Sequence, residues 1–277
     1  MTSYKANINN LRAQRDKNTS SDPLHWLNLA GLFWLEEGEN SFGNDKSSKI
    51  SLPAFPLAHC GAFYFKGGLI TLQSAKEVNI TINGRIPEAR PLRTDRDKET
   101  DLINIGSLTM KIIIRGGVPL VRIWDSESPA GRNFTGFHYY PVKPEYRVIA
   151  KYIPYDPPKP IKIMEVIGTE IDSMFLGQAQ FALNGVHYTL EAEQSGDELL
   201  FNFTDGTNKD TTYGGGRKFY LPIPKGDEII LDFNLTENWP CAYTAFATCP
   251  IPPKENHLPI KIEAGEMKYS ECKEKGQ

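Results

Sequence analysis

Polar side chains that could bind or act on a small ligand are concentrated in the last third of the chain. The segment T-T-Y-G-G-G-R ends in Arg217, and the segment D-F-N contains Asp232 and Asn234. Side chains alternate between the two faces of a strand, so Asp232 and Asn234 are expected on one face. A guanidinium keeps its charge in a protein, and an Arg217 inside a sheet therefore needs an anion beside it.

Two sources of that anion are open. Carboxylates of the chain that could serve are Asp205, Asp210, Asp232 and Glu266, and the first choice is an internal pair in which Asp232 neutralises Arg217. The other source is a bound ligand, held in a partly enclosed polar pocket. In that case the sequence predicts a site for a small anionic or hydroxylated molecule, lined by Thr212, Tyr213, Arg217, Asp232 and Asn234.

The same part of the chain allows two other functions. A hydrolase-type enzyme would use Asp232 or Glu266 as general base and Asn234 as a donor to a developing oxyanion. A structural or interaction protein would use these side chains only to fix the fold. The chain has no G-x-S-x-G and no H-E-x-x-H motif, so neither of those hydrolase types is predicted, and no cofactor is expected.

Two cysteines and a histidine follow at equal spacing. Cys241, Cys249 and His257 lie eight residues apart. Zinc takes four ligands, typically from closely spaced pairs, so we predict no metal site and name these three only as its candidate ligands. A disulfide is a second alternative, and two buried thiols are the favoured interpretation, because free cysteine packs like a small apolar residue.

Residues 236–260 form a long irregular segment around these cysteines, with four prolines in 250–259. Connections of this length in compact domains are usually either functional or disordered. The prolines and the amide side chains argue against disorder. We therefore expect an ordered loop that packs over the sheet carrying Arg217 and Asp232.

The elements that must position these residues are mostly strands. Residues 1–30 are predicted to be a helical segment, with a second helix start at 20–23. After Gly31, short runs of β-branched and aromatic residues are separated by turn residues, which is typical of strands. The sequence predicts a mainly β protein, with an N-terminal helical segment and then two antiparallel β-sandwich or barrel-like subdomains, residues 31–128 and 129–277. The proline-rich segment 155–160 is either a crossing between subdomains or a loop inside one sheet.

The composition excludes several classes of protein. The chain has 277 residues, of which 40% are hydrophobic and 23% charged, so it is expected to be globular. Its net charge of −3 creates no global field that would attract nucleic acid or an anionic membrane. No apolar run approaches the roughly 20 residues that span a bilayer. The polar N-terminus resembles no signal peptide, so a cytoplasmic location is expected. The sequence carries no signal for the oligomeric state.

Several motifs occur in a characteristic order. They are W-L-N-L-A-G-L-F-W-L-E-E-G-E-N-S-F-G, R-I-W-D-S, F-x-Y-Y-P-V, D-G-T-N-K-D-T-T-Y-G-G-G-R, L-D-F-N, C-A-Y-T-A-F-A-T-C-P-I-P-P-K-E-N-H-L-P and A-G-E. This order resembles the domain-of-unknown-function family 1684 of bacteria and archaea, over most of the chain. Trp239 departs from the family's usual proline, and His257 replaces a residue that is often arginine. The resemblance implies a prokaryotic protein and brings no activity with it.

A second set of motifs lies in residues 38–115. It runs G-E-N-S-F-G-N-D, I-S-L-P, A-H-C-G-A-F, G-L-I-T-L, I-N-G-R and I-G-S-L-T-M. This order is similar to that of forkhead-associated domains, which are β-sandwiches that bind phosphothreonine. Asn44 follows Gly43, and Ala58 precedes His59, so the phosphate-binding residues of those domains are absent here. The resemblance implies a sandwich-like fold and no phosphopeptide function.

Overall fold

The computed structural model describes residues 3–269. The chain forms two compact units, of which unit 1 contains Met1–Thr19 and Thr135–Gln277, and unit 2 contains Ser20–Phe134. Both units are built mainly from antiparallel strands, so the prediction of a mainly β protein with an N-terminal helix is confirmed. Among residues 3–269, no helix has both the length and the apolar character needed to cross a membrane.

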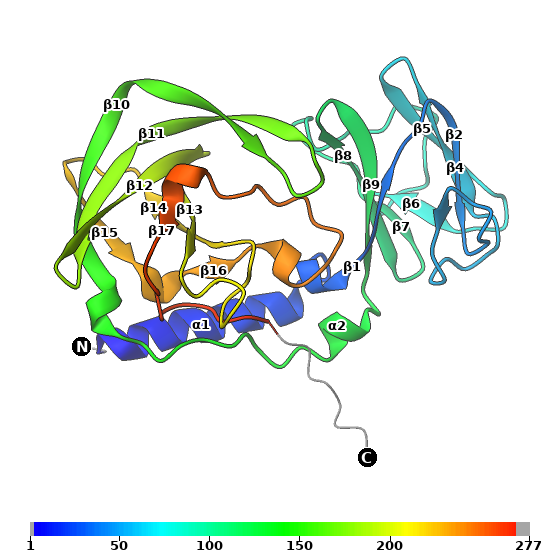
Figure 1. The fold of residues 1–277 in the computed structure, drawn as a ribbon. Helices are drawn as coiled ribbons and strands as arrows, with labels where there is room; N and C mark the ends of the chain where they lie inside the picture. Colours follow the sequence, from blue (N-terminus) through cyan, green and yellow to red (C-terminus); the bar gives the residue numbers. More distant parts are fainter. Residues whose placement is uncertain (1–2, 270–277) are drawn as a thin grey trace. The chain divides into compact units, whose positions relative to one another are not determined.

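Unit 1 is built around one curled sheet of eight strands (Figure 1). The hydrogen-bonded order is β15-β10-β11-β12-β13-β14-β16, and β17 pairs in parallel with β13. The strands are β10 (Arg147–Met164), β11 (Glu170–Leu183), β12 (Val186–Ser195), β13 (Glu198–Asp205), β14 (Arg217–Pro222), β15 (Glu228–Asp232), β16 (Glu237–Asn238) and β17 (His257–Leu258). Four 3-10 turns complete the unit: η2 (Pro144–Tyr146), η3 (Phe233–Leu235), η4 (Pro240–Ala242) and η5 (Lys254–Asn256).

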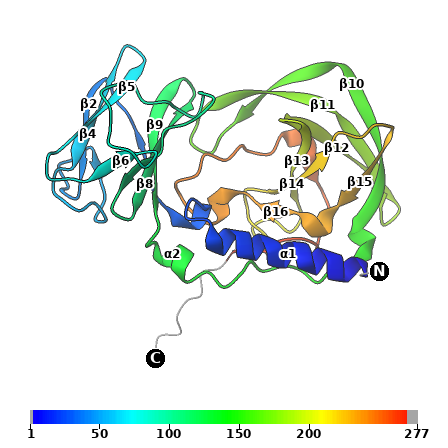
Figure 2. The ribbon, with the colours of Figure 1, turned by 180° about the vertical axis from the view of Figure 1, so that it is seen from behind.

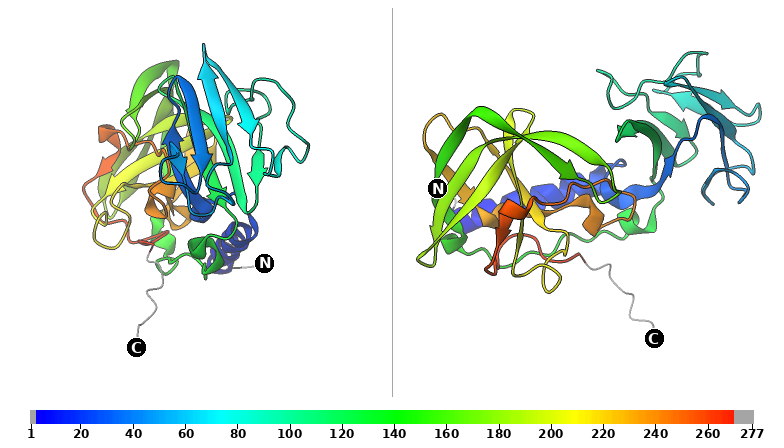
Figure 3. Two further views of the ribbon diagram at one scale, coloured as in Figure 1. Left: turned by 90° about the vertical axis from the view of Figure 1, so that its right-hand side faces the viewer. Right: turned by 45° about the horizontal axis from the view of Figure 1, so that its top comes forward.

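The long β10–β11 hairpin bends as it crosses the sheet (Figure 3). The pairing register shifts between Pro154 and Lys159, where the proline-rich segment 155–160 lies inside β10. Proline cannot donate to the ladder, so pairing is interrupted there and the strand can change direction. Opposite, a Cβ atom on Gly177 would lie 2.5 Å from the Ile153 carbonyl oxygen, so only glycine allows this close approach.

The interior of this sheet is a single apolar cluster, contributed by nearly every strand of the unit. Aromatic rings dominate it, and Phe201 stacks on Phe219 with ring centroids 5.1 Å apart. Phe233, which starts η3 directly after β15, packs edge-on against Phe203 and Phe219. Burial of these rings fixes the end of β15 and thus the positions of Asp232 and Asn234.

Helix α1 (Tyr4–Ser21) runs past the end of β15 and along η3 and β16 (Figure 2). Its buried residues are Ile8 and Thr19, so it is held largely by polar contacts. The predicted helix start at 20–23 is wrong, because α1 ends there. Asp22 Oδ1 accepts the Leu24 amide at 2.8 Å in a turn, and Pro23 has no amide to continue a helix.

Unit 2 contains two sheets that share one apolar core. The first has the order β1-β9-β8-β7-β6 and the second β3-β2-β4-β5. Their bounds are β1 (Leu29–Trp34), β2 (Gly38–Gly43), β3 (Ile50–Ser51), β4 (Gly61–Lys66), β5 (Leu69–Ser74), β6 (Ile80–Ile82), β7 (Ile103–Ile105), β8 (Leu108–Arg115) and β9 (Val118–Asp125), with η1 (Trp26–Asn28) and α2 (Pro129–Arg132) beside them. The forkhead-associated likeness of this unit stays a prediction.

Candidate functional site

Arg217 is fully buried at the start of β14. Its Nη2 lies 2.7 Å from Asp205 Oδ2 and donates to the Ile262 carbonyl at 2.8 Å. Its Nη1 donates to the Ala264 carbonyl and lies 3.4 Å from Thr236 Oγ1. The charge of this guanidinium is therefore neutralised by a carboxylate of its own chain.

The partner of Arg217 is Asp205, so the predicted pairing with Asp232 is wrong. Asp205 ends β13, the strand that pairs directly with β14, and Phe203 is the register partner of Arg217. Asp232 ends β15, at the other end of the sheet order. Sheet order, which no local pattern of the sequence reveals, decides which carboxylate reaches the guanidinium.

Asp232 and Asn234 do lie together, around the start of η3. Asp232 Oδ1 accepts the Asn234 backbone amide and the Asn234 Nδ2, both at 3.1 Å. The Asn234 side chain also donates to the Lys143 carbonyl at 2.9 Å and accepts the Lys143 amide at 2.9 Å. Asp232 receives the Tyr4 hydroxyl of α1 at 2.8 Å on each oxygen. The pair thus ties α1 and the segment before β10 to the end of β15.

Glu266 is fully buried beside β16. Arg15 Nη1 lies 2.9 Å from its Oε2, the Asn238 amide donates to the same oxygen at 3.0 Å, and the Tyr243 hydroxyl donates to Oε1 at 2.6 Å. Burial raises the pKa of Glu266, while Arg15 and the Tyr243 hydroxyl oppose that shift. Glu266 thereby joins α1 to the C-terminal segment.

The other predicted pocket residues have separate surroundings. Thr212 is buried in the turn between β13 and β14, with its hydroxyl 2.8 Å from Thr207 Oγ1. Tyr213 packs against a small cluster that contains Leu200, Trp239 and Cys249, and burial raises its pKa to about 12. The structure thus brings Asp232 and Asn234 together and places Arg217, Thr212 and Tyr213 in other contacts.

The cysteines and His257 also have separate partners. The Cys241 amide donates to Cys249 Sγ at 3.2 Å, and no disulfide joins the two residues. His257 Nδ1 lies 3.0 Å from Thr204 Oγ1. Among residues 3–269, no three His, Cys, Asp or Glu side chains are grouped so that they could hold a metal ion.

Two parts of residues 236–260, around Trp239 and Asn256, bond to β12 and β13. Trp239 Nε1 donates to Asn202 Oδ1 at 2.7 Å. Asn256 accepts the Glu191 amide at 2.7 Å and donates to the Glu191 and Asn202 carbonyls at 3.0 and 2.9 Å. These amide side chains satisfy backbone groups of the sheet that the irregular segment covers.

A hollow of about 330 Å³ is lined by residues of α1, β14, η3 and β16. We call it the α1 hollow. Apolar and aromatic side chains form much of its wall, and two arginines of α1 and an amide face it. Its lining residues are Leu11, Arg12, Arg15, Tyr139, Phe219, Tyr220, Asn234, Leu235 and Glu237.

Arg12 is the distinctive residue of the α1 hollow. Its Nη1 donates to the Tyr140 carbonyl and its Nη2 to the Asn234 carbonyl, both at 3.0 Å, and its guanidinium lies 4.5 Å from the Tyr139 ring centroid. Its Nε is buried and has no hydrogen-bond partner among residues 3–269. No carboxylate of the described chain forms an ion pair with it. Burial lowers the pKa of Arg12, since this charge is only partly solvated.

Glu237, the carboxylate of this hollow, is already engaged by other cations. Arg15 Nε lies 3.0 Å from its Oε1, and Lys218 Nζ lies 3.5 Å from its Oε2. Arg15 is also paired with Glu266, so the charges of Arg15, Lys218, Glu237 and Glu266 balance. Arg12 is the cation of the hollow that forms no direct ion pair among residues 3–269, although the Asp232 carboxylate attracts it from beyond ion-pair distance.

Sequence reasoning missed Arg12 and Arg15, although one signal was present. Ile8, Leu11, Arg12 and Arg15 are spaced three and four residues apart, and such residues share one face of a helix. Two arginines on the same face as the apolar side chains indicate that this face contacts the rest of the protein, partly through charged groups. That face could have been proposed as part of a site.

Comparisons with known proteins find a family and a solved structure, both uncharacterised. A family model described as "Protein of unknown function (DUF1684)" matches residues 132–267. A solution NMR structure of an uncharacterized protein from Haloarcula marismortui is 31% identical, over 50% of this chain and 80% of that chain, with a TM-score of 0.42. No curated protein matches the chain.

Proposed function

The chain belongs to this family of proteins of unknown function, and we propose from the geometry beside α1 that unit 1 binds a small anionic molecule in the α1 hollow. The observation that carries the proposal is Arg12, a partly buried guanidinium without a carboxylate partner among residues 3–269. The ligand's anionic group would supply the directly paired anion that Arg12 lacks among residues 3–269.

The donors of Arg12 suit such a group. A guanidinium has five N–H groups, and the two backbone carbonyls account for two of them. These two bonds and the Tyr139 ring fix the orientation of the guanidinium. A carboxylate that approaches a fixed guanidinium loses less entropy on binding than one that meets a mobile side chain.

The rest of the α1 hollow favours a ligand with an apolar body. Leu11, Leu235 and Phe219 form apolar wall, and the Tyr220 ring adds to it. The volume, about 330 Å³, is at the lower end of the range for small-molecule sites. We therefore propose a small carboxylate with an aliphatic or aromatic body.

Arg217 no longer carries the binding proposal. Its guanidinium donates to Asp205 and to backbone carbonyls, as the internal alternative required. The hydrolase alternative stays a prediction. Asp232 and Glu266, its candidate general bases, both accept hydrogen bonds from side chains of this chain.

Thermal unfolding with paired ligands tests the proposal. Benzoate, hexanoate and 4-hydroxybenzoate are each compared with the corresponding primary amide, which has the same shape without the charge. At about 100 times its Kd, a bound carboxylate should stabilise the protein by about 2.7 kcal/mol, while the amide should do little. Equal effects of acid and amide would show that the charge of Arg12 is not what the ligand meets.

Two variants locate the effect. Arg12→Gln keeps a polar side chain of similar length and should abolish the stabilisation by carboxylates. Lys5→Ala removes a cation from an exposed position of the same helix and should leave it unchanged. If Arg12→Gln responds to carboxylates as the parent protein does, the α1 hollow is not their site.

A further inference from the structure

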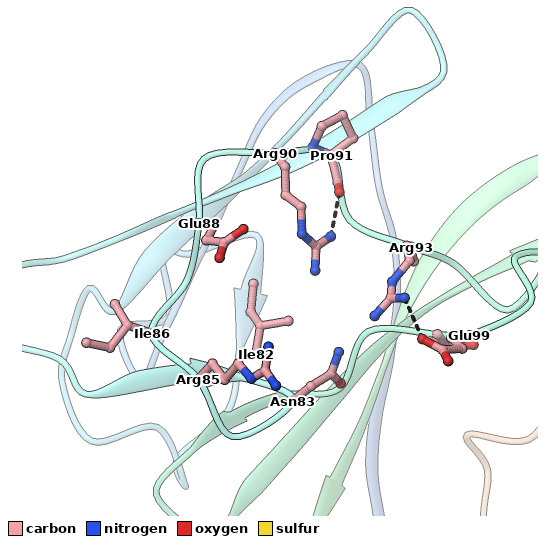
Figure 4. Close-up of a pocket in the computed structure, with 10 residues that line it drawn as sticks. Ile82, Asn83, Arg85, Ile86, Glu88, Arg90, Pro91, Arg93 and Glu99 are labelled. Atoms are coloured by element: carbon pink, nitrogen blue, oxygen red, sulfur yellow. Dashed lines mark hydrogen bonds and ion pairs between the residues drawn. The ribbon is translucent and has the colours of Figure 1, made fainter.

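A second hollow, of about 750 Å³, lies entirely within unit 2, where the connection from β6 to β7 folds over itself (Figure 4). We call it the arginine hollow. Its lining residues are Ile82, Asn83, Arg85, Ile86, Glu88, Arg90, Pro91, Arg93, Glu99 and Thr100. Three of these ten residues are arginines, which come from three different points of one connection and face a common space (Figure 4).

Asp101, which is 1% exposed, fixes two of these arginines from beneath. Arg90 Nη1 and Nη2 lie 2.6 and 3.0 Å from its two oxygens. Arg93 Nε and Nη2 lie 3.1 and 2.9 Å from its Oδ1. Burial alone would raise the pKa of Asp101, but hydrogen bonds from Arg90 and Arg93 hold it well below its usual range. Asp101 is thus a permanent anion shared by two cations.

The carboxylates of the arginine hollow differ in exposure, since Asp101 at its base is buried and Glu99 at its rim is exposed. Glu99 lies 2.7 Å from Arg93 Nη1, but its side chain is 73% exposed. Exposed ion pairs contribute little, because water and salt screen them. Glu88 is exposed and attracts Arg90 through its charge, and among residues 3–269 no carboxylate forms an ion pair with Arg85. The fixed base of the hollow therefore holds two guanidiniums for one carboxylate, and the third guanidinium lies across from it.

Unused donors remain on both fixed arginines. Arg90 makes three hydrogen bonds, two to Asp101 and one to the Pro91 carbonyl. Arg93 also makes three with its guanidinium, two to Asp101 and one to Glu99. Each guanidinium has five N–H groups, so each retains two. These donors belong to side chains already held in place, which is the arrangement that recognises oxyanions with little loss of entropy.

We propose that the arginine hollow binds an oxyanion group, with Arg90 and Arg93 as its fixed donors and Arg85 closing on it from the opposite side. The group is a tetrahedral phosphate or a carboxylate pair, since both present several oxygens to forked donors. On binding, Glu99 releases Arg93 Nη1 to the ligand and turns to solvent. The site is independent of Arg12 and of unit 1.

Isothermal titration in low-salt buffer with inorganic phosphate and, separately, with malonate tests this site. Saturable binding of either anion at one site per chain supports the proposal, and the tighter of the two identifies the class. Arg85→Ala should weaken binding roughly tenfold, as expected for the loss of one charge-assisted contact. Lys66→Ala removes an exposed cation at the end of β4 and should change nothing.

The exposed carboxylate Glu99 provides a second test of the proposed site. Glu99→Gln should tighten binding about two- to fivefold, because it frees Arg93 Nη1 without moving the backbone. Arg12→Gln should leave binding in the arginine hollow unchanged. The proposal is overturned if neither anion binds saturably, if Arg85→Ala and Lys66→Ala behave alike, or if Glu99→Gln weakens binding.

Discussion

Two arginines of unit 1, Arg217 and Arg12, differ in whether a carboxylate of the chain pairs with the guanidinium. Arg217 is fully buried, paired with Asp205 at 2.7 Å and surrounded by backbone carbonyls. Arg12 is only partly buried and bonds two backbone carbonyls, but no carboxylate of residues 3–269 pairs with it. The region around Arg217 is closed, while the α1 hollow beside Arg12 is open.

The difference separates a structural role from a binding role. A buried ion pair becomes strongly destabilising when one partner is lost, so Arg217 is required for stability. A cation that keeps unused donors beside an open space can take a counter-ion from outside. The presence of an arginine in the sequence does not distinguish these two roles. The presence or absence of a carboxylate partner in the structure does.

The largest expected effect is on Arg217. Arg217→Met keeps much of the volume but leaves the Asp205 carboxylate buried without its cation. We expect a loss of about 3–5 kcal/mol in the free energy of unfolding, measured by urea denaturation. Arg12→Met, the matched change, should cost far less. Equal losses of unfolding free energy for Arg217→Met and Arg12→Met would contradict the assignment of a structural role to Arg217 and a binding role to Arg12.

Asp205→Asn examines the same pair from the other side. The amide oxygen can still accept the Thr207 amide, which lies 2.8 Å from Asp205 Oδ1. Arg217 would lose its counter-charge, and we expect a loss of about 3 kcal/mol by urea denaturation. In combination with Arg217→Met the losses should be less than additive by at least about 1 kcal/mol. Strict additivity would mean that the two residues do not interact.

The attachment of α1 sets the shape of the α1 hollow, and Tyr4→Phe weakens it. The Tyr4 hydroxyl donates to both oxygens of Asp232 at 2.8 Å, so its removal should cost about 1–2 kcal/mol. Amide hydrogen exchange should become faster along α1. Tyr64→Phe removes a hydroxyl that meets the exposed Glu39 in unit 2, and it should have almost no effect on stability. A cost as small for Tyr4→Phe would contradict polar docking of α1.

Glu193 is a buried carboxyl group of unit 1 that forms no ion pair among residues 3–269. It is therefore the acidic counterpart of Arg12. Its side chain is 5% exposed, Ser173 donates to Oε1 at 2.7 Å, and Oε2 has no hydrogen-bond partner. Burial raises the pKa of Glu193, so the folded state holds its proton to higher pH than the unfolded state does. Stability should therefore fall as pH rises above the unfolded pKa of about 4.3 and through the folded value.

Glu193→Gln should remove that pH dependence and stabilise the protein by about 1 kcal/mol at pH 8, measured by urea denaturation. At pH 4, parent and variant should be similar. The exposed Glu198, on the neighbouring strand, serves as control, and Glu198→Gln should show no such pH dependence. A variant that loses stability at pH 8 would indicate a cation near Glu193 that the structure does not show.

Strand patterns in the sequence predict most of the fold. Alternation and turn residues give the mainly β architecture, and the need of a guanidinium for an anion leads to the internal pairing of Arg217. The partner of Arg217 could not be predicted, because the choice between Asp205 and Asp232 depends on sheet order. Asp232 and Asn234 were expected to lie together because a single residue, Phe233, separates them, but a 3-10 turn after β15 brings them together and not a shared strand face.

The candidate site itself could not be predicted, because its cation comes from a helix more than 200 residues before the strands it meets. Arg12 bonds the Asn234 carbonyl across a separation of 222 residues. The sequence of α1 predicts a short amphipathic helix in which most residues are polar. Only the shared face of Arg12, Arg15 and the neighbouring apolar side chains indicates docking, and nothing local indicates against which strands.

A crystal structure with 4-bromobenzoate tests the central claim most directly, because anomalous scattering locates the bromine. We expect the bromine against the apolar wall of the α1 hollow and the carboxylate oxygens about 2.7–3.1 Å from the Arg12 guanidinium. Crystals of Arg12→Gln should show no bound ligand there. Bromobenzoate seated elsewhere, or bound in the same pose without the guanidinium, would contradict the account.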